Sequence, residues 1–429
     1  MKRKFALLLL GAMVIQLLAG CAAPATTPAP EPTQAPSVTE PTAVPEPQPV
    51  LKIGVSVSQT GATANLGSNL KDGYAFWMDR VNELGGIQVG DKKYLVELVY
   101  YDDASDAETS VKLTEKLITD DEVSFLFGPF GSGTTNATSA VGEKYEVLTF
   151  ASMANANSIY ERGFKYTFGI LPLAGTQARP GLELAKAKGL KTVAIVTPDD
   201  LWPRTVAEGA KKLAEGMGLE VVYFQAYPKG ANDLSSMISQ MKALAPDALV
   251  GTGYEAECIL MTRQMKELKF NADVVVFSGA TTYFDFIKSV GVDSNGILGL
   301  DWWTKEASWS GGIFGDAATY AKDFQAEFGY EPRYVSAAAS AAGEILRLAL
   351  EAAGTTETEA VKQALLNLDA EIFFGKFNFD ETGANTAGSA MGTQIVWSDA
   401  ANYKFFLVWP LAVQLQEPLF PKPFWGDLK

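Results

Sequence analysis

The sequence predicts an α/β protein whose globular part forms two lobes, each built on a parallel β-sheet. Two observations predict this fold. Short apolar runs of strand length alternate with segments of helical period from residue 51 to residue 277, and such alternation is typical of parallel sheets covered by helices on both faces. The units are also too numerous for one small open sheet, so we expect two lobes.

Strands are expected where apolar runs have strand length, and helices where apolar residues recur at helical spacing. In segment 67–82, Leu70, Tyr74, Trp77 and Val81 fall on one helical face. Ser105 is a plausible cap for the helix that follows it. The strands expected in this region are 51–57, 94–101, 123–127, 192–197, 221–225, 248–250 and 274–277. The helices expected between them are 67–82, 105–119, 132–143, 203–217, 234–244 and 255–268.

The last third of the chain has a different pattern. Helices are expected at 320–328, 335–353 and 358–368, and the alanine content of the second helix suggests close helix packing. Strands with hairpin-like links are expected at 373–379, 393–397 and 403–409. Antiparallel strands after helices fit a return of the chain from one lobe to the other.

The N-terminus reads as an export signal at residues 1–20. Lys2, Arg3 and Lys4 precede an apolar run that is short for a membrane span, as in a secretory signal peptide. The sequence from Leu18 to Cys21 resembles the bacterial lipobox, which implies lipidation of Cys21. The alternative is an ordinary signal peptide with an incidental cysteine.

Residues 21–50 are expected to be a tether. Prolines alternate with Ala, Thr, Glu and Gln, and this composition offers little apolar surface to offset the entropy of ordering. Proline makes such a segment extended and semi-stiff. A lipidated Cys21 followed by this tether would hold the protein at the outer face of the bacterial membrane, on the periplasmic or extracellular side. A segment without function is the alternative.

Composition excludes several functions. The net charge of −15 argues against nucleic acid as a partner. The absence of histidine excludes a Ser-His-Asp triad, an HExxH zinc site and a Cys/His metal cluster. We find no phosphate-binding GxxxxGK[ST] motif, so ATP hydrolysis by that route is not expected. These absences, together with the family resemblance described below, lead us to expect no cofactor, no metal and no enzymatic activity. Glycosidase-like carboxylate chemistry stays open, although no pair of acids is singled out. Cys258 is expected to be a buried helix residue.

Several motifs occur in an order and spacing that resemble the leucine/isoleucine/valine-binding family of periplasmic binding proteins. The shared segments are Ile53-Gly54-Val55 with Thr60-Gly61, Asn82 to Ile87 (N-x-x-GGI), Tyr101-Asp102-Asp103, Gly128 to Gly133, Asp199 to Trp202, and Phe374 to Asp380. The resemblance implies a type I fold, in which two Rossmann-like lobes are joined by three hinge crossings around a ligand cleft. It also implies a solute-binding receptor that serves the permease and ATPase of an ABC importer.

The resemblance places the crossings near residues 169–172, 299–302 and 375–379. The N-terminal lobe would then comprise residues 51–171 and 301–375. The C-terminal lobe would comprise residues 172–300 and 376–415, with a tail at 416–429. A monomer is expected.

The ligand site is expected at strand ends that face the cleft. Ser132 starts a helix after a strand and a glycine-rich turn, where its hydroxyl and nearby N–H groups suit an anion. By resemblance, Ser132 holds the ligand carboxylate; a simple N-cap serine is the alternative. Ala154 and Asn155 match a small residue and a threonine of the family, so Asn155 is a departure. Trp202, Tyr254 and Trp302 are expected to form aromatic walls, with core packing as the alternative.

A second departure concerns the ligand's ammonium group. The family has a glutamate where our alignment places Ala280. A buried ammonium without a carboxylate is unfavourable, so either Glu255, Glu257 or Asp301 substitutes or the solute has no α-amino group. Amino acids are favoured as ligands, ahead of amides, urea and aromatic carboxylates. A sensor accessory lipoprotein and a carboxylate-dependent hydrolase are the other function classes.

Overall fold

The computed structural model describes residues 47–279 and 284–428. Residues from Gln48 onward form one compact unit, which carries every strand and helix given below. The predicted signal peptide, Cys21, most of the tether and Ala280 lie outside the described residues. Within the described ranges, no helix combines the length and apolar character that a membrane span requires.

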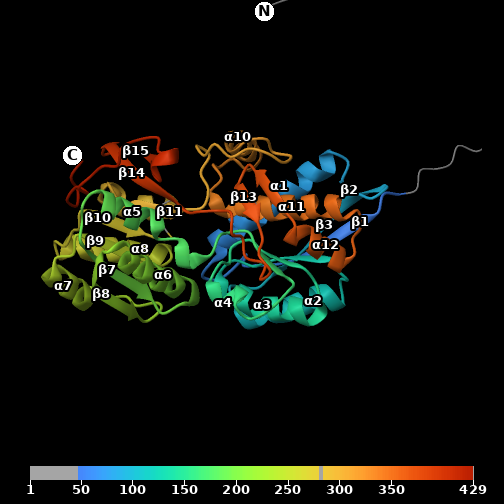
Figure 1. Ribbon diagram of the computed structural model, residues 1–429, viewed down its shortest axis with the longest axis horizontal. Coiled ribbons are helices and arrows are strands. Elements are labelled where there is room, and N and C mark those ends of the chain that lie inside the picture. The colour runs from blue at the N-terminus through green and yellow to red at the C-terminus, as the bar shows by residue number, and fades with distance from the viewer. Residues whose placement is uncertain (1–46, 280–283, 429) are drawn as a thin grey trace, which may run out of the picture. The chain divides into compact units, whose positions relative to one another are not determined.

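The first sheet has six strands in the order β2-β3-β1-β4-β5-β6. Its strands β1, β2 and β3 are labelled at the right of Figure 1. All neighbours are parallel except the β2–β3 pair, which is antiparallel. The strands are β1 Val50–Val57, β2 Ile87–Val89, β3 Lys92–Asp102, β4 Phe125–Phe127, β5 Thr149–Ala151 and β6 Thr167–Gly169. The β1, β3 and β4 predictions are confirmed, whereas β2, β5 and β6 were not predicted.

The second sheet has seven strands in the order β15-β14-β11-β10-β9-β7-β8. It is parallel from β8 to β11 and ends in two antiparallel strands. Its strands are β7 Thr192–Pro198, β8 Glu220–Tyr227, β9 Ala248–Gly251, β10 Val274–Phe277, β11 Leu298–Asp301, β14 Met391–Asp399 and β15 Asn402–Trp409. A separate hairpin pairs β12 Asp369–Ile372 with β13 Gly375–Asn378.

Helices cover the faces of both sheets. They are α1 Ala64–Glu83, α2 Ala107–Thr119, α3 Ser132–Tyr145, α4 Asn157–Tyr160, α5 Arg179–Ala187, α6 Leu201–Met217, α7 Ser235–Leu244, α8 Glu255–Glu267, α9 Phe284–Val290, α10 Ala317–Phe328, α11 Tyr334–Ala353 and α12 Thr358–Leu366. Short 3₁₀ turns lie at Ala174–Thr176, Gly291–Ser294 and Leu411–Val413. The sequence predicts most of these helices, but α4, α5 and α9 were missed.

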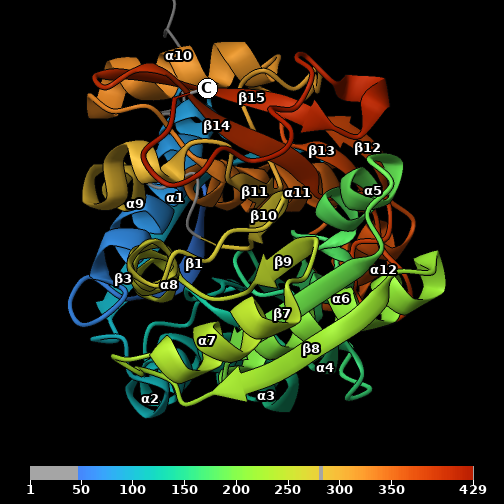
Figure 2. The same ribbon diagram turned by 90° about the vertical axis from the view of Figure 1, so that its left-hand side faces the viewer.

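The second sheet is buried on both faces, as its continuous apolar strands predict. Val193 and Ile195 in β7 pack with apolar residues of α5 and α6, whereas Ala194 and Val196 pack with those of α7 and α8. Figure 2 shows these helices flanking the sheet. Cys258 belongs to the α8 layer and is buried, which confirms its predicted role.

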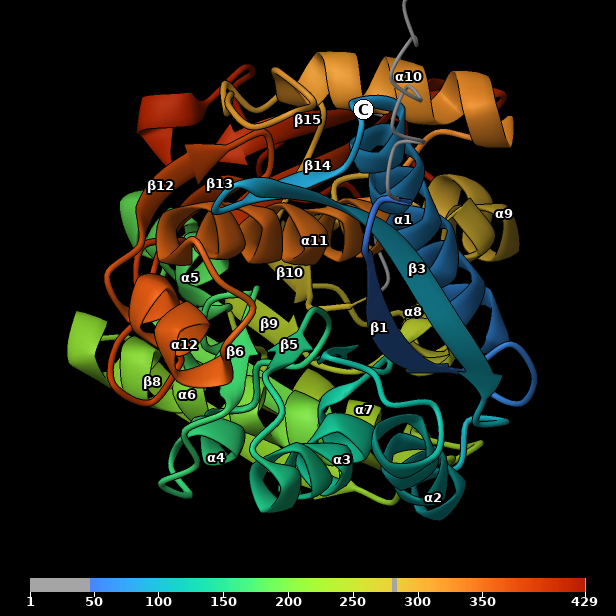
Figure 3. The same cartoon turned by 90° about the vertical axis from the view of Figure 1, so that its right-hand side faces the viewer.

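Close packing of α11 against α1 completes the layer around the first sheet (Figure 3). A Cβ atom at Gly73 would lie 2.2 Å from the Ser336 carbonyl oxygen, and one at Gly343 would lie 2.0 Å from the Trp77 ring. The Ser340 hydroxyl also donates a 2.6 Å hydrogen bond to the Gly73 carbonyl. These contacts confirm the close packing that the alanine-rich segment suggested.

One local prediction is wrong, and one strand begins later than expected. Asp106, not Ser105, caps α2, because its carboxylate accepts the Thr109 N–H at 2.8 Å. The Ser105 hydroxyl instead donates to the Thr60 carbonyl at 2.8 Å, which ties the loop after β3 to the loop after β1. The strand expected at 373–379 is confirmed as β13, but it begins at Gly375, because Phe373 and Phe374 form the turn between β12 and β13.

Candidate ligand-binding site

Ser132 lies at the first turn of α3, directly after β4 and a glycine-rich turn. Gly131 precedes the helix with φ 92°, a backbone conformation that glycine adopts readily. Because Gly131 is the N-cap, Ser132 is the first helical residue and the N-cap alternative is wrong. The Ser132 hydroxyl accepts the N–H groups of Asn155 and Ala156, both at 3.2 Å. These two bonds leave the hydroxyl proton available for donation to a third group.

Asn155 ties the site to the segment that leads from the first sheet to the second. Its side-chain Nδ2 donates to the Pro172 carbonyl at 2.6 Å, and its own carbonyl accepts the Ala174 N–H at 2.8 Å. Ala154 is fully buried, and its carbonyl accepts the Tyr160 hydroxyl at 2.8 Å. Asn155 therefore braces the connection while its backbone N–H holds Ser132.

Aromatic rings from segments that follow strands of the two sheets meet beside Ser132. The Trp202 ring, at the start of α6, lies 5.1 Å from the Tyr254 ring, just before α8. Phe130, in the turn before α3, lies 6.3 Å from Tyr254. A Cβ atom at Gly279 would lie 2.9 Å from the Trp202 ring, so Trp202 packs directly on the backbone after β10.

One small cavity brings five of the six predicted site residues together, namely Ser132, Asn155, Trp202, Tyr254 and Trp302. Ala154 does not line it. The cavity also borders residues that the sequence did not single out, namely Phe130, Gly131, Met153, Leu171, Gly279 and Tyr334. Its volume of about 20 Å³ has room for about one water molecule.

Tyr254, one of the two tyrosines that line this cavity, stays neutral at ordinary pH. Burial raises the pKa of Tyr254 well above its usual value, and the charges of Asp200 and Tyr334 act in the same direction. The Asp200 carboxylate is itself paired with Lys229. Tyr254 can therefore act as a neutral hydroxyl donor or acceptor beside Ser132.

The described residues that line this cavity include no carboxylate. Of the three acids considered as substitutes, Glu257 accepts the Tyr254 N–H at 3.2 Å and so caps α8. Glu255 lines another pocket near α1, and burial, then Asp285, raises its pKa. Asp301 ends β11 and lines a third pocket, where the Thr393 hydroxyl donates to it. Within the described ranges, no three acid or cysteine side chains gather in a way that could hold a metal ion.

Two α/β layers that meet at a small cavity are the architecture of a bilobal binding protein. A family model described as "Periplasmic binding protein" matches residues 50–400, and the chain belongs to this family. The resemblance inferred from the sequence motifs is therefore confirmed.

Relatives support the same assignment over most of the chain. The chain is 26% identical over 393 residues to a protein of Brucella suis named "Leu/Ile/Val-binding protein homolog 7". This match covers 87% of this chain and 94% of the relative.

Solved structures share the fold. The substrate-binding protein LivJ of Streptococcus pneumoniae, in complex with isoleucine, has a TM-score of 0.70 at 20% identity and covers 83% of this chain and 99% of its own. A solute-binding protein of R. palustris in complex with benzoate has a TM-score of 0.70 at 18% identity and covers 88% of this chain and 98% of its own. The predicted type I fold with parallel-sheet cores is therefore confirmed.

Proposed function

We propose that this protein is an exported, lipid-anchored receptor that binds a small carboxylate-bearing solute and delivers it to an ABC importer. The observation that carries the proposal is the setting of Ser132. Its hydroxyl is oriented by two backbone N–H groups at the start of α3, where free N–H groups and the helix dipole favour an anion. Family membership supports export and solute binding.

Two ligand classes are favoured over amides and urea, and amino acids are the first of them. The Brucella relative carries a name for leucine, isoleucine and valine, and LivJ was solved with isoleucine. Aromatic carboxylates are the second class. Trp202, Tyr254 and Phe130 supply aromatic faces, and the R. palustris protein was solved with benzoate.

A binding panel tests this function. Isothermal titration of the purified protein with the branched-chain amino acids, benzoate, amides and urea should give saturable binding by at least one carboxylate. Absence of binding by every compound of the panel would contradict the receptor proposal. Preference for benzoate over 4-methylpentanoate and leucine would select the aromatic class.

The receptor is proposed to have no enzymatic activity, since the histidine chemistry that many hydrolases use is absent from the sequence. Its partners would be the solute, the cognate permease and the ATPase, with the protein itself a monomer. A sensor accessory lipoprotein is the second candidate; pull-down of a permease by the solute-loaded protein would decide between the two.

Anchoring through Cys21 is a separate part of the proposal. Incorporation of labelled palmitate in the producing cells should depend on Cys21, so a Cys21→Ser variant should carry no label and leave the membrane fraction. Labelling that persists in the variant would contradict the anchor.

Each of the two lobes is proposed to be built on one of the two large sheets. The boundary expected between residues 375 and 376 would divide β13, which pairs with β12 along its whole length. A boundary after β13 and before β14 therefore suits the strand pairing better.

A further inference from the structure

Gln177 lies on the connection that leads from the first sheet to the second, directly after the 3₁₀ turn Ala174–Thr176. Its side chain is fully buried and does not line the Ser132 cavity. Its Nε2 donates to the Ser278 carbonyl at 3.1 Å and to the Leu300 carbonyl at 3.2 Å. One side chain of the connection therefore holds two neighbouring strands, β10 and β11, near their carboxyl ends.

The two acceptors fix the orientation of this amide. The reversed amide would set the Gln177 Oε1 against the same two carbonyl oxygens, and an oxygen without a proton cannot donate to them. Only the orientation with Nε2 toward Ser278 and Leu300 forms both bonds. If Gln177 were replaced by an apolar side chain, both buried carbonyl groups would lose this donor, which is unfavourable.

The first acceptor, Ser278, supports the aromatic wall of the cavity. Ser278 precedes Gly279, on which the Trp202 ring packs. The Ser278 hydroxyl also accepts the Gly253 N–H at 3.3 Å, one residue before Tyr254. A shift of Ser278 would therefore move the backbone on which both aromatic rings depend.

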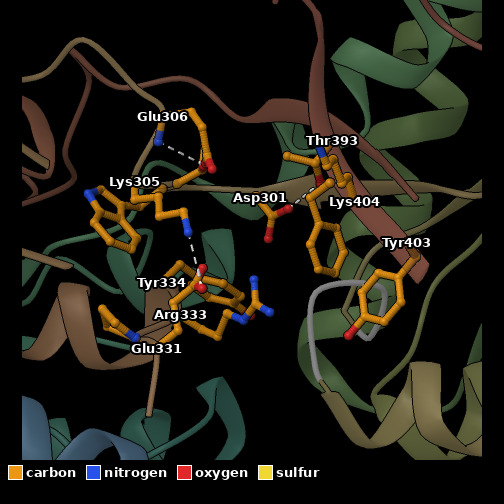
Figure 4. Close-up of a pocket in the computed structure, with 13 residues that line it drawn as sticks. Asp301, Lys305, Glu306, Glu331, Arg333, Tyr334, Thr393, Tyr403 and Lys404 are labelled. Carbon is orange, nitrogen blue, oxygen red and sulfur yellow. Dashed lines mark hydrogen bonds and ion pairs between the residues drawn. The ribbon is translucent and has the colours of Figure 1, made fainter. Parts of the chain in front are cut away.

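The second acceptor, Leu300, lies on β11 two residues before Trp302, which lines the same cavity. β11 also pairs with β14, where the Thr393 hydroxyl donates to the Asp301 carboxylate (Figure 4). The bond from Gln177 adds an attachment to the connection between the sheets. The strand end that leads into Trp302 is thus held from β14 and from the connection.

The same connection is bonded to Ser132. The Asn155 N–H donates to the Ser132 hydroxyl, and the Asn155 carbonyl accepts the Ala174 N–H at 2.8 Å. The Ala174 carbonyl in turn accepts the Gln177 N–H at 3.0 Å. Hydrogen bonds therefore link the serine on one side of the cavity, through Gln177, to the strand ends that carry the aromatic wall on the other side.

We propose that Gln177 is a positioning residue of the solute site, and that it keeps the Trp202 wall at the distance from Ser132 at which one solute contacts both. This inference rests on the proposed function and assigns control of solute affinity to a residue that does not touch the solute. Without the two Nε2 bonds, the strand ends that carry Gly279 and Trp302 would shift relative to the connection. A solute would then lose part of its contact with either the hydroxyl or the aromatic wall.

The first test uses Gln177→Met, which removes both donors and keeps the length of the side chain. Titration with the carboxylate of the panel that binds most tightly should show an affinity about tenfold weaker than that of the native protein. Gln394→Met is the matched control. The buried Gln394 Nε2 also donates to two carbonyl groups, of Gly296 at 2.9 Å and of Leu419 at 3.1 Å, and Gln394 does not line the cavity. Gln394→Met should lower the free energy of unfolding, as Gln177→Met does, and leave the affinity unchanged.

The outcomes of this titration separate the inference from the proposed function. Native affinity in Gln177→Met would overturn the inference while the receptor proposal stands. Equal losses of affinity in Gln177→Met and Gln394→Met would also overturn it, because the loss would then follow from lower stability. Absence of binding by the native protein would overturn both.

A double-mutant cycle tests the link between Gln177 and Ser132. When Ser132→Ala is combined with Gln177→Met, the loss of affinity should be smaller than the product of the two single losses, because a displaced wall already weakens the bond to Ser132. When Ser132→Ala is combined with Gln394→Met, the loss should equal the product of the single losses. Multiplicative losses in both pairs would refute the positioning of the wall relative to Ser132.

Gln177→Glu keeps the shape of the side chain and tests the proposal if Gln177→Met fails to fold. A neutral carboxyl group still donates one bond, whereas its ionised form would face two carbonyl oxygens. The affinity should therefore be weaker than that of the native protein and should fall further from about pH 5 to about pH 9. Gln394→Glu should match the affinity of the native protein at each pH. Native affinity of Gln177→Glu throughout this range would overturn the proposal.

Discussion

The backbone N–H of Asn155 donates a 3.2 Å hydrogen bond to the hydroxyl of Ser132, across 23 residues of sequence. This bond joins the loop after β5 to the start of α3, and the Ala156 N–H adds a second bond to the same oxygen. Ser132 is thereby fixed as a donor toward the cavity. The site is thus preorganised by backbone groups, which a side-chain pattern alone would not reveal.

Ser132→Ala should weaken binding of a carboxylate solute by about 1–3 kcal/mol, because one charge-assisted hydrogen bond is lost. Isothermal titration with the best ligand of the panel measures this change. Ser139→Ala is a matched control in the same helix, since the Ser139 hydroxyl accepts from Arg162 at 2.6 Å and lies outside the cavity. Equal losses in both variants would mean that α3 is perturbed as a whole.

Asn155→Ala should act on stability more than on ligand chemistry. It removes the Nδ2 donor of the 2.6 Å bond to Pro172 and leaves a buried carbonyl without that donor. Such a loss costs about 1–3 kcal/mol. Urea unfolding measures the change in the free energy of unfolding. Unchanged stability combined with lost ligand binding would instead identify Asn155 as a direct ligand contact.

Gly279→Ala should displace Trp202. The added Cβ atom would lie 2.3 Å from the Gly253 carbonyl oxygen and 2.9 Å from the Trp202 ring, and overpacking of this kind costs about 1–3 kcal/mol. The variant should unfold at lower urea and show altered tryptophan fluorescence. Gly216→Ala in α6 is the control, because a Cβ atom there would meet no neighbouring atom within 4 Å. This variant should stabilise the helix by about 0.5–1 kcal/mol. Similar behaviour of the two variants would refute the packing argument.

The sequence predicts the longer apolar strands and Ser132 because these depend on local patterns. β1 is a run of eight residues, while β5 and β6 have three each, too few to establish a period. The equally short β4 was predicted because it ends a longer strand-like run, 123–127. Contacts between distant parts of the chain also escape sequence analysis. Tyr334 lines the Ser132 cavity, although it lies in a helix about two hundred residues further along the chain. Such long-range contacts depend on tertiary packing, which no local spacing encodes.

The segment expected to be a C-terminal tail is attached to the second sheet layer. The Lys422 N–H donates to the Asp273 carbonyl at 2.8 Å, and the Trp425 indole donates to the Phe270 carbonyl at 2.5 Å. Lys422 is 4% exposed and lies 3.6 Å from the centre of the Trp425 ring. Burial lowers its pKa to about 7, although Asp293 opposes the shift.

This depressed pKa predicts a pH-dependent stability. Between about pH 7 and about pH 10 the unfolded chain keeps the Lys422 proton while the folded protein releases it, so stability rises with pH in this window. Below pH 7 both states are protonated and the contribution is constant. Relative to Lys422→Met, the native protein should gain about 2 kcal/mol between pH 7 and pH 9.

Urea unfolding at pH 6, 7, 8 and 9 measures this difference, because the variant lacks the titrating amine but keeps an apolar stem of similar length. Lys212→Met, at an exposed position on α6, controls for the loss of one positive charge from an acidic protein. It should follow the pH profile of the native protein. Parallel profiles for the native protein and Lys422→Met would show that Lys422 stays protonated when folded, with the Trp425 ring face holding the cation against the effect of burial.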